Sequence, residues 1–419
     1  MKKIVAMMLA LVLVLSMASV AWAAEGDTAP AATQPDSKLG TTTPITITKG
    51  YVINGSDTTD NDYSKHPADT ITFAVAKDGK EYYFNGQKSD AATVPDLNSI
   101  TVSTITESTD KATITIGLPT YSKVGEYVYY LVETGNKTAG VTYNYDGSAD
   151  DKFLTLKVTV INDTDEKSET KGQLIVGGIA LRQGKTPNPV TKAEDVMLKK
   201  LDSTSGDSDN VHNEYEAGKL TVSKTVSGNL GDTNKNWIFK ATFKTTAEET
   251  VRGTITVTKT GNAVYAGEAN SAPQADKDGV VNLTAATKDE ITPGAGWQEK
   301  TVYFSLQSDA TLTFVNVPEG VEWEVTEVEA GMYGYTTTAT SSDTTVTATT
   351  ENKEAVAATA QTKGSITAAK QADTAAYTNT KTQTVDTGVS ITMVPYLMIL
   401  AVAMVGAAMM IIRRRKENM

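Results

Sequence analysis

The chain contains two sets of one lysine, one glutamate and one asparagine, in the same order and on otherwise apolar strand faces: Lys49, Glu133 and Asn213, then Lys224, Glu327 and Asn379. Burying any of these groups without a partner costs several kcal/mol, so the members of each set should meet. A lysine amine, a carboxyl and a carboxamide that meet away from water are able to react with one another.

The expected reaction follows from how burial changes protonation. Desolvation disfavours charge, so it lowers the pKa of a lysine and raises the pKa of a glutamate. The neutral amine is then a nucleophile, and the protonated carboxyl can donate a hydrogen bond to the asparagine side-chain oxygen and carry protons. Attack of the amine on the asparagine side-chain carbon expels ammonia and leaves an amide bond. The alternative is three unrelated residues, with the lysine reaching out to water; the repetition of the set favours the reaction.

Strands are the elements that would hold these residues, because side chains alternate between the two faces of a strand. Lys49 shares a face with Ile47, and Lys224 lies in the middle of an apolar stripe. Short alternating runs rich in Thr and Val, with turn residues between them, fill residues 44–215 and 219–379. This pattern is typical of half-buried antiparallel strands, so the sequence predicts an all-β fold.

The runs fall into two groups, which predicts two tandem β-sandwich domains at residues 43–216 and 217–381. Residues 183–210 are expected to form a long loop of the first domain. The Thr- and Ala-rich residues 336–376 fit either short strands or an exposed surface. Residues 24–42 have no periodicity and indicate a flexible leader.

The N-terminus has the pattern of a secretory signal peptide, residues 1–23. Two lysines precede an apolar stretch, and Ala21-Trp22-Ala23 offers a small-x-small cleavage site. An N-terminal membrane helix is the alternative, and the polar residues that follow argue against it. The chain has no cysteine and a net charge of −12. We therefore expect an acidic protein outside the membrane that has no disulfides and does not bind nucleic acid.

The C-terminus combines Thr387-Gly388, an apolar run at residues 391–412 and a basic tail at residues 413–419. The run is long enough to cross a bilayer as a helix, and the basic residues hold that end in the cytoplasm. With residues 382–390, these features resemble the cell-wall sorting signal of Gram-positive surface proteins, in which a sortase cuts between Thr and Gly and joins Thr to an amine. The pentapeptide departs from the usual Leu-Pro-x-Thr-Gly by having Thr and Val in place of Leu and Pro. A plain membrane anchor is the alternative.

Six segments carry a second resemblance: Ile-Thr-Ile-Thr-Lys49, Tyr-Val-Tyr-Tyr-Leu-Val-Glu133, Val-His-Asn213-Glu-Tyr, Leu-Thr-Val-Ser-Lys224-Thr-Val-Ser-Gly, Trp-Glu-Val-Thr-Glu327-Val and Tyr-Thr-Asn379-Thr. They resemble strands of the streptococcal-type pilin isopeptide-linkage domain. The resemblance implies Ig-like sandwiches and a sortase-anchored pilus shaft subunit on the cell wall. It also implies one self-formed bond in each domain. By this resemblance Lys49 would bond to Asn213 with Glu133 assisting, and Lys224 to Asn379 with Glu327 assisting.

The partners implied are a sortase and either other pilin subunits or the peptidoglycan cross-bridge. A shaft subunit also needs a lysine that receives Thr387 of the next subunit. Lys199 and Lys200, before a Ser/Asp-rich loop, are the predicted receivers, although any exposed lysine of the first domain competes. The rival function is a monomeric wall- or membrane-anchored adhesin that binds a host or environmental ligand.

A multiple-turnover enzyme is not expected. The two histidines, His66 and His212, lie in unrelated contexts, no Gly-rich phosphate loop opens a helix, and no cluster has metal-ligand spacing. The Asp-rich residues 57–62 and 202–209 lack the ordered ligand pattern of a calcium loop. The sequence therefore predicts no cofactor, no metal and only a single-turnover self-cross-linking reaction.

Overall fold

The computed structural model describes residues 44–53, 66–89, 93–107, 109, 111–135, 137–185, 211–268, 283–342, 345–349 and 360–383. The described chain consists of strands and one 3-10 turn, Met332–Gly334, which confirms the predicted all-β class. Within these ranges no helix is long and apolar enough to cross a membrane. The predicted signal peptide, leader, apolar run and basic tail lie outside the described residues.

Two facing sheets make up the first domain. The order of one sheet is β4 (Ser99–Ile100), β6 (Lys111–Gly117), β1 (Ile45–Ile53), β12 (Val211–Tyr215) and β9 (Val141–Thr142). The order of the other is β11 (Leu174–Gln183), β10 (Leu154–Asn162), β7 (Gly125–Thr134), β2 (Asp69–Phe84) and β3 (Gln87–Lys88), with β5 (Ser103–Ile105) paired to β2. Inward residues of β1, β6 and β10 alternate with outward ones, as period-two patterning predicts.

Two larger sheets make up the second domain. The order of one is β18 (Glu290–Ile291), β16 (Ile255–Thr260), β20 (Thr311–Pro318), β13 (Ala217–Ser227), β25 (Ala372–Thr380), β22 (Thr336–Ser341) and β23 (Thr345–Thr349). The order of the other is β17 (Ala263–Gly267), β19 (Glu299–Leu306), β14 (Trp237–Lys244), β21 (Glu322–Glu327) and β24 (Ala360–Ser365). The described parts of the Thr- and Ala-rich residues 336–376 are thus mostly strands, because β-branched threonine fits a pleated, half-buried surface.

The first and last strands of each domain lie side by side and run parallel. β1 pairs with β12, and β13 pairs with β25. The other pairings within each domain are antiparallel between the described strands. A parallel pair cannot be joined by a tight hairpin, so the rest of each domain forms the connection between these two strands.

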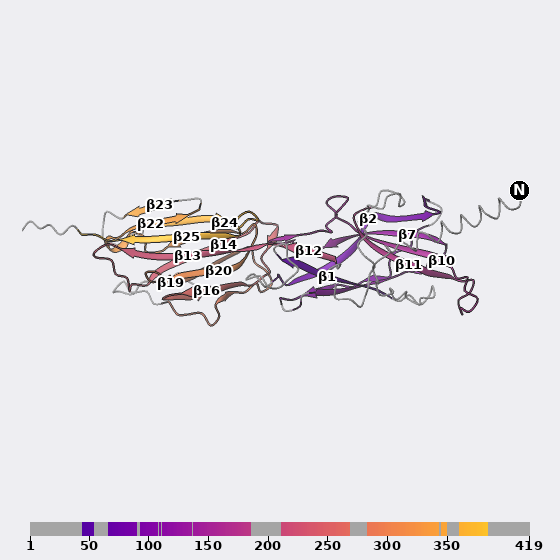
Figure 1. Cartoon of the computed structure of the whole chain (residues 1–419), viewed down its shortest axis with the longest axis horizontal. Helices are drawn as coiled ribbons and strands as arrows, with labels where there is room; N and C mark the ends of the chain where they lie inside the picture. The colour runs from indigo at the N-terminus through magenta and orange to yellow at the C-terminus, as the bar shows by residue number, and fades with distance from the viewer. Residues whose placement is uncertain are drawn as a thin grey trace, which may run out of the picture.

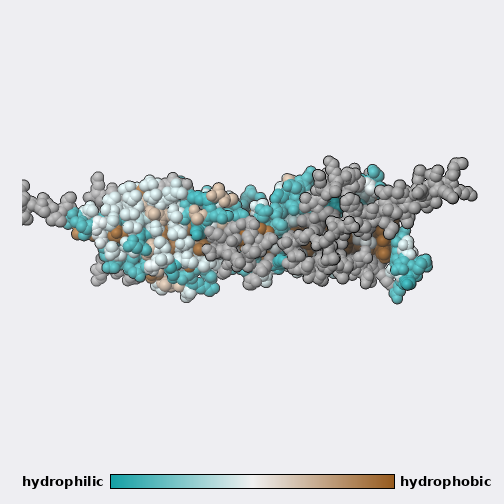
Figure 2. Space-filling view, in the orientation of Figure 1, coloured by the Kyte–Doolittle hydropathy of each residue, from teal (hydrophilic) through white to brown (hydrophobic). Residues whose placement is uncertain are grey.

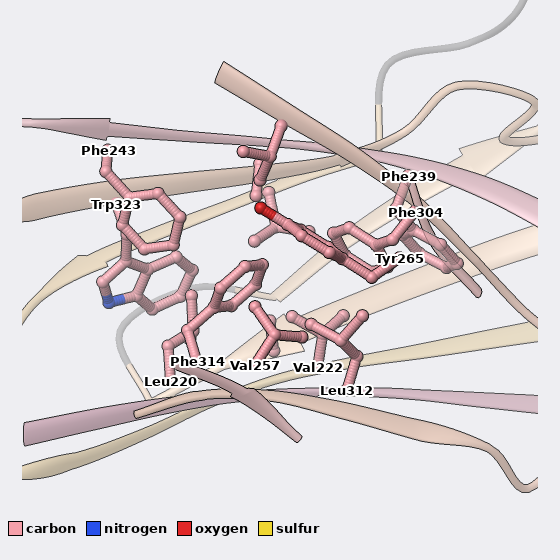
Figure 3. Packing of buried hydrophobic residues seen from close by; sticks show 14 of the residues in the cluster. Leu220, Val222, Phe239, Phe243, Val257, Tyr265, Phe304, Leu312, Phe314 and Trp323 are labelled. Atoms are coloured by element: carbon pink, nitrogen blue, oxygen red, sulfur yellow. The ribbon is translucent and has the colours of Figure 1, made fainter. Parts of the chain in front are cut away.

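Aromatic side chains pack against one another and against aliphatic ones in the core of the second domain (Figure 3). Phe239 stacks on Phe304 with ring centroids 5.3 Å apart, and Phe314 meets Phe304 edge-on at 5.8 Å. Such ring pairs add about 1 kcal/mol each to the hydrophobic gain of burial. The core therefore holds the two sheets in a fixed relation.

The two domains follow each other along one long axis (Figure 1). β12 ends at Tyr215 and β13 begins at Ala217, so β1 and β12 both run toward the second domain. β13 and β25 then run away from the first domain. The described chain therefore begins within the first domain, at Pro44, and ends at Gln383 at the far end of the second. The described surface of the second domain is mostly pale to teal in Figure 2, as expected for strands whose outer faces meet water.

The junction between the domains is built from paired backbone and a shared core. β8 (Lys137–Thr138) of the first domain pairs in parallel with β15 (Glu249–Thr250) of the second. The N–H of Ala139 donates to the carbonyl of Thr250 at 2.9 Å, and the Ala139 side chain is fully buried in the apolar cluster of the second domain. The Glu107 carboxylate also accepts the Thr254 N–H at 2.5 Å. These contacts indicate a stiff junction.

Ala139→Lys should open this junction, because an unpaired charge in apolar surroundings costs several kcal/mol. Small-angle X-ray scattering should show a broader distribution of overall molecular dimensions for this variant than for the wild-type protein. Ala149→Lys adds the same charge at an exposed turn of the first domain and should leave the scattering unchanged. Identical curves for all three proteins would contradict the role assigned to Ala139.

Candidate functional site

The first lysine, glutamate and asparagine come from three strands and two sheets. Lys49 lies on β1, Asn213 on the neighbouring strand β12, and Glu133 on β7 of the facing sheet. The register pairs Lys49 with Val211 and Tyr51 with Asn213. Lys49 and Asn213 are therefore diagonal neighbours on the same inward face, and Glu133 approaches them from across the core.

The carboxylate of Glu133 contacts both nitrogens. Lys49 Nζ lies 3.1 Å from Glu133 Oε2, and Asn213 Nδ2 donates to the two carboxylate oxygens at 3.0 Å each. The backbone N–H of Asn144 donates to Asn213 Oδ1 at 3.1 Å. Lys49 is fully buried, and the Glu133 side chain is 5% exposed. The three predicted residues thus meet away from water.

The second set has the same arrangement. Lys224 Nζ lies 2.8 Å from Glu327 Oε2, and Asn379 Nδ2 donates to Glu327 Oε1 at 2.5 Å. The hydroxyl of Thr337 donates to Asn379 Oδ1 at 2.6 Å. The side chains of Lys224 and Glu327 have no exposed area, and Asn379 is fully buried.

Strand register explains why the two sites are alike. Lys224 pairs with Tyr377, two residues before Asn379, just as Lys49 pairs with the residue two before its asparagine. On the facing sheet each glutamate stands opposite a phenylalanine of the neighbouring strand, Phe73 or Phe239. The side-chain direction of each residue is therefore set by backbone pairing rather than by loop conformation.

Aromatic rings exclude water around each lysine. Lys49 Nζ lies 4.8 Å from the centre of the Tyr145 ring, and Lys224 Nζ lies 4.7 Å from the Trp237 ring. Burial lowers the pKa of Lys49 to about 8, although the Glu133 charge opposes the shift. Burial likewise lowers the pKa of Lys224 to about 8 against the opposing charge of Glu327. Both amines therefore lose their proton far more readily than a lysine in water.

Burial also changes the second-domain carboxyl. It raises the pKa of Glu327 above the usual range, and the nearby Lys224 only partly opposes this. The pKa values of Lys224 and Glu327 are thus closer to each other than those of an exposed lysine and glutamate. Such a pair is able to pass a proton from nitrogen to oxygen and back.

The orientation of each asparagine differs from the expectation that the glutamate polarises the amide oxygen. A backbone N–H can only donate, so the Asn213 atom that faces the Asn144 N–H must be oxygen, and Nδ2 must face Glu133. Asn379 has the same orientation, with Nδ2 on Glu327. The glutamate therefore contacts the lysine amine and the amide nitrogen, while another donor binds the amide oxygen.

Sequence reasoning missed both oxygen donors. Thr337 lies in a Thr-rich run in which nothing distinguishes one threonine from the next. The Asn144 donor is a backbone group, which has no residue-type signal. Only the pairing of neighbouring strands brings these groups to the asparagine.

A direct lysine–asparagine hydrogen bond elsewhere in the first domain shows how the two buried sites differ from an ordinary contact. Lys152 Nζ donates to Asn144 Oδ1 at 3.2 Å at the partly exposed edge of the first domain. The amide oxygen faces this lysine, whereas at the two buried sites the amide nitrogen and the lysine share a carboxylate. An amine that donates a hydrogen bond to the amide oxygen is not placed to attack the amide carbon.

The remaining predicted residues, Thr387, Gly388, Lys199 and Lys200, lie outside the described residues. In the described part of the chain, no group of three or more His, Cys, Asp or Glu side chains is placed to hold a metal ion.

Comparison with known proteins gives a partial family match and several structural neighbours. A family model described as a domain of unknown function (DUF7601) matches residues 218–381. No curated protein matches the chain. The major pilin of Streptococcus pyogenes is 20% identical, with 81% of this chain and 99% of that chain covered and a TM-score of 0.45. The major pilin protein T3.2 of a Streptococcus pyogenes serotype is 17% identical, covers 81% and 98%, and has a TM-score of 0.42.

A pilus-presented adhesin is 19% identical over 55% of this chain and 36% of that chain, with a TM-score of 0.24. The structural neighbours are thus pilin and pilus-adhesin structures, as the sequence resemblance predicts. At these scores the likeness carries no argument about chemistry, which rests on the chain's own residues.

Asn379→Ala removes the amide and leaves Lys224 beside Glu327 alone, so the stability of this variant should depend on pH. In the unfolded protein Lys224 has its usual pKa, whereas in the folded protein its pKa is about 8. Between these two pH values the unfolded state therefore binds more protons than the folded state. The free energy of unfolding should therefore rise by about 2 kcal/mol from pH 7.5 to 9.5. Urea unfolding at both pH values measures it. Adding Lys224→Met should abolish the rise; a rise that persists would be inconsistent with a buried, readily deprotonated Lys224.

Proposed function

We propose that each domain forms one intramolecular amide bond, Lys49 to Asn213 and Lys224 to Asn379, and that the chain is a pilus shaft subunit of a Gram-positive bacterium. The observation that carries this proposal is the repeated site: in both domains a buried lysine and asparagine on parallel first and last strands share one glutamate.

The reaction uses an amine and an amide that already contact one carboxylate. The neutral amine of Lys224 attacks the side-chain carbon of Asn379, and negative charge moves to Oδ1. Glu327 takes a proton from the attacking nitrogen and delivers one to Nδ2, which leaves as ammonia when the carbon–nitrogen bond breaks. The products are a secondary amide and ammonia, and the carboxyl returns to its starting state. Glu133 has the same position between Lys49 and Asn213.

The bonds would suit a protein under tension. Force enters the second domain at the start of β13 and leaves at the end of β25, because these strands lead in from the first domain and out to Gln383. A bond from Lys224 to Asn379 carries the load through a few residues and bypasses the rest of the fold. It also removes chain entropy from the unfolded state, by about 5 kcal/mol on the model used for long disulfide loops.

Attachment is the second part of the proposal. Sortase would cut between Thr387 and Gly388 while the apolar run, residues 391–412, holds the precursor in the membrane. Thr387 would then join Lys199 or Lys200 of another subunit, or the peptidoglycan cross-bridge. The absence of cysteine fits the proposed intramolecular bonds, since amide cross-links would replace disulfides as the covalent reinforcement.

Intact mass measurement of the recombinant ectodomain, residues 24–387, tests the cross-links. Each bond releases one ammonia, so the mass should fall by about 17 Da per bond, or about 34 Da in total. A folded protein with the unmodified mass would refute the proposal.

Glutamate variants provide the controls for this measurement. Glu133→Ala and Glu327→Ala should each lose the bond of their own domain, because no other group bridges the two nitrogens there. Each variant should therefore show a loss of about 17 Da. The Lys152–Asn144 contact should contribute no third loss in any protein.

Fractionation of the native host tests the attachment. A sortase product is held by a covalent bond, so only wall digestion should release it, with Thr387 at the new C-terminus. Detergent release at full precursor mass would instead mean a membrane-anchored protein. On an immunoblot of the wall digest a pilus gives a ladder that Lys199→Ala with Lys200→Ala should collapse, whereas an adhesin gives a single band.

A further inference from the structure

We propose that the hydroxyl of Thr337 is a catalytic group of the second domain, which stabilises the negative charge that forms on Asn379 Oδ1 during bond formation. This inference rests on the proposed function and adds the group that activates the amide.

The hydroxyl is held in a donating orientation. The backbone N–H of Gly331 donates to Thr337 Oγ1 at 2.8 Å, so the hydroxyl hydrogen is free to point at Asn379 Oδ1, 2.6 Å away. Gly331 has a left-handed backbone, with φ of 69°, which glycine adopts without strain. It follows Glu327 by a short turn, so the strand that brings the carboxylate also leads to the group that orients the hydroxyl.

The position of Thr337 is set by strand order. β25 lies between β13, which carries the nucleophile, and β22, whose Thr337 stands directly opposite Asn379. Lys224 therefore approaches the amide from one neighbouring strand, the hydroxyl from the other, and Glu327 from the facing sheet. Thr337 has no exposed area, and a donor that is fixed before the reaction in a dry site is worth far more than one in water.

The first domain performs the same task with its backbone. In the first domain β9 occupies the place that β22 has in the second. It pairs with β12 on the side away from β1, and it ends at Thr142. The N–H of Asn144 therefore does not belong to the ladder and donates to Asn213 Oδ1 instead. In the second domain the β22–β25 ladder continues past Asn379. The backbone there belongs to the ladder, so the Thr337 hydroxyl donates to the amide oxygen instead.

The test follows bond formation in the full chain made by cell-free translation in detergent. Translation is stopped, samples are unfolded in denaturant, and the peptides that join Lys224 to Asn379 and Lys49 to Asn213 are quantified by mass spectrometry. Thr337→Val should slow the second-domain bond on the order of 100-fold, the usual effect of removing one such donor. The first-domain bond should form at the wild-type rate and serves as an internal control.

Donor strength separates this role from a packing role. Thr337→Ser keeps the hydroxyl and should restore nearly the full rate, while Thr337→Cys, a weaker donor of similar size, should lie between serine and valine. Thermal unfolding of Glu327→Ala with and without Thr337→Val measures the effect on folding alone, since neither protein forms the second bond.

Rates that follow donor strength support the proposal even if the valine variant folds poorly. Equal rates for Thr337→Val and wild type, or a serine variant as slow as the valine variant, would overturn it while leaving the proposed cross-links intact. Absence of both joined peptides from the wild type would instead overturn the proposed function, and this inference with it.

Discussion

The cost of burying a lysine amine is the constraint on which the rest of this structure depends. Lys49 and Lys224 lie fully inside apolar cores, where a lone ammonium would destabilise the fold by several kcal/mol. A carboxylate from the facing sheet offsets this cost at each site, and burial lowers the pKa of both amines to about 8. The same desolvation that would weaken an ordinary domain favours the neutral, nucleophilic amine, so the cost of the buried site and the proposed chemistry have one cause.

The two sites share register and differ in how the amide oxygen is held. Parallel pairing of first and last strands places each lysine two residues from register with its asparagine. The oxygen donor is a backbone N–H in the first domain and the Thr337 hydroxyl in the second. The difference follows from the strand beside the asparagine strand: β9 ends before it reaches Asn213, whereas β22 continues past Asn379. The proposed reaction centre is thus compatible with different surroundings, provided that each supplies one donor to the amide oxygen.

The junction between the domains would stiffen the protein in addition to the proposed cross-links. Residue Ala139 of the first domain is part of the core of the second, and β8 pairs with β15 across the boundary. The described chain ends at Gln383, at the end of the second domain that lies away from the first. Stiffness at the junction and covalent ties within each domain would both act along the long axis of the two domains, which is the direction in which a surface fibre is pulled.

The sequence by itself determined the all-β class, the inward faces of the strands and the six polar residues on those faces. These follow from the period of two in side-chain direction, which is local. It did not decide whether the Thr-rich residues 336–376 form strands, because threonine suits both a strand and an exposed surface. Nor did it reveal the orientation of the amides, Thr337 as a donor or the burial of Ala139. Those depend on which strands lie beside one another across long stretches of chain, and only the tertiary structure sets that pairing.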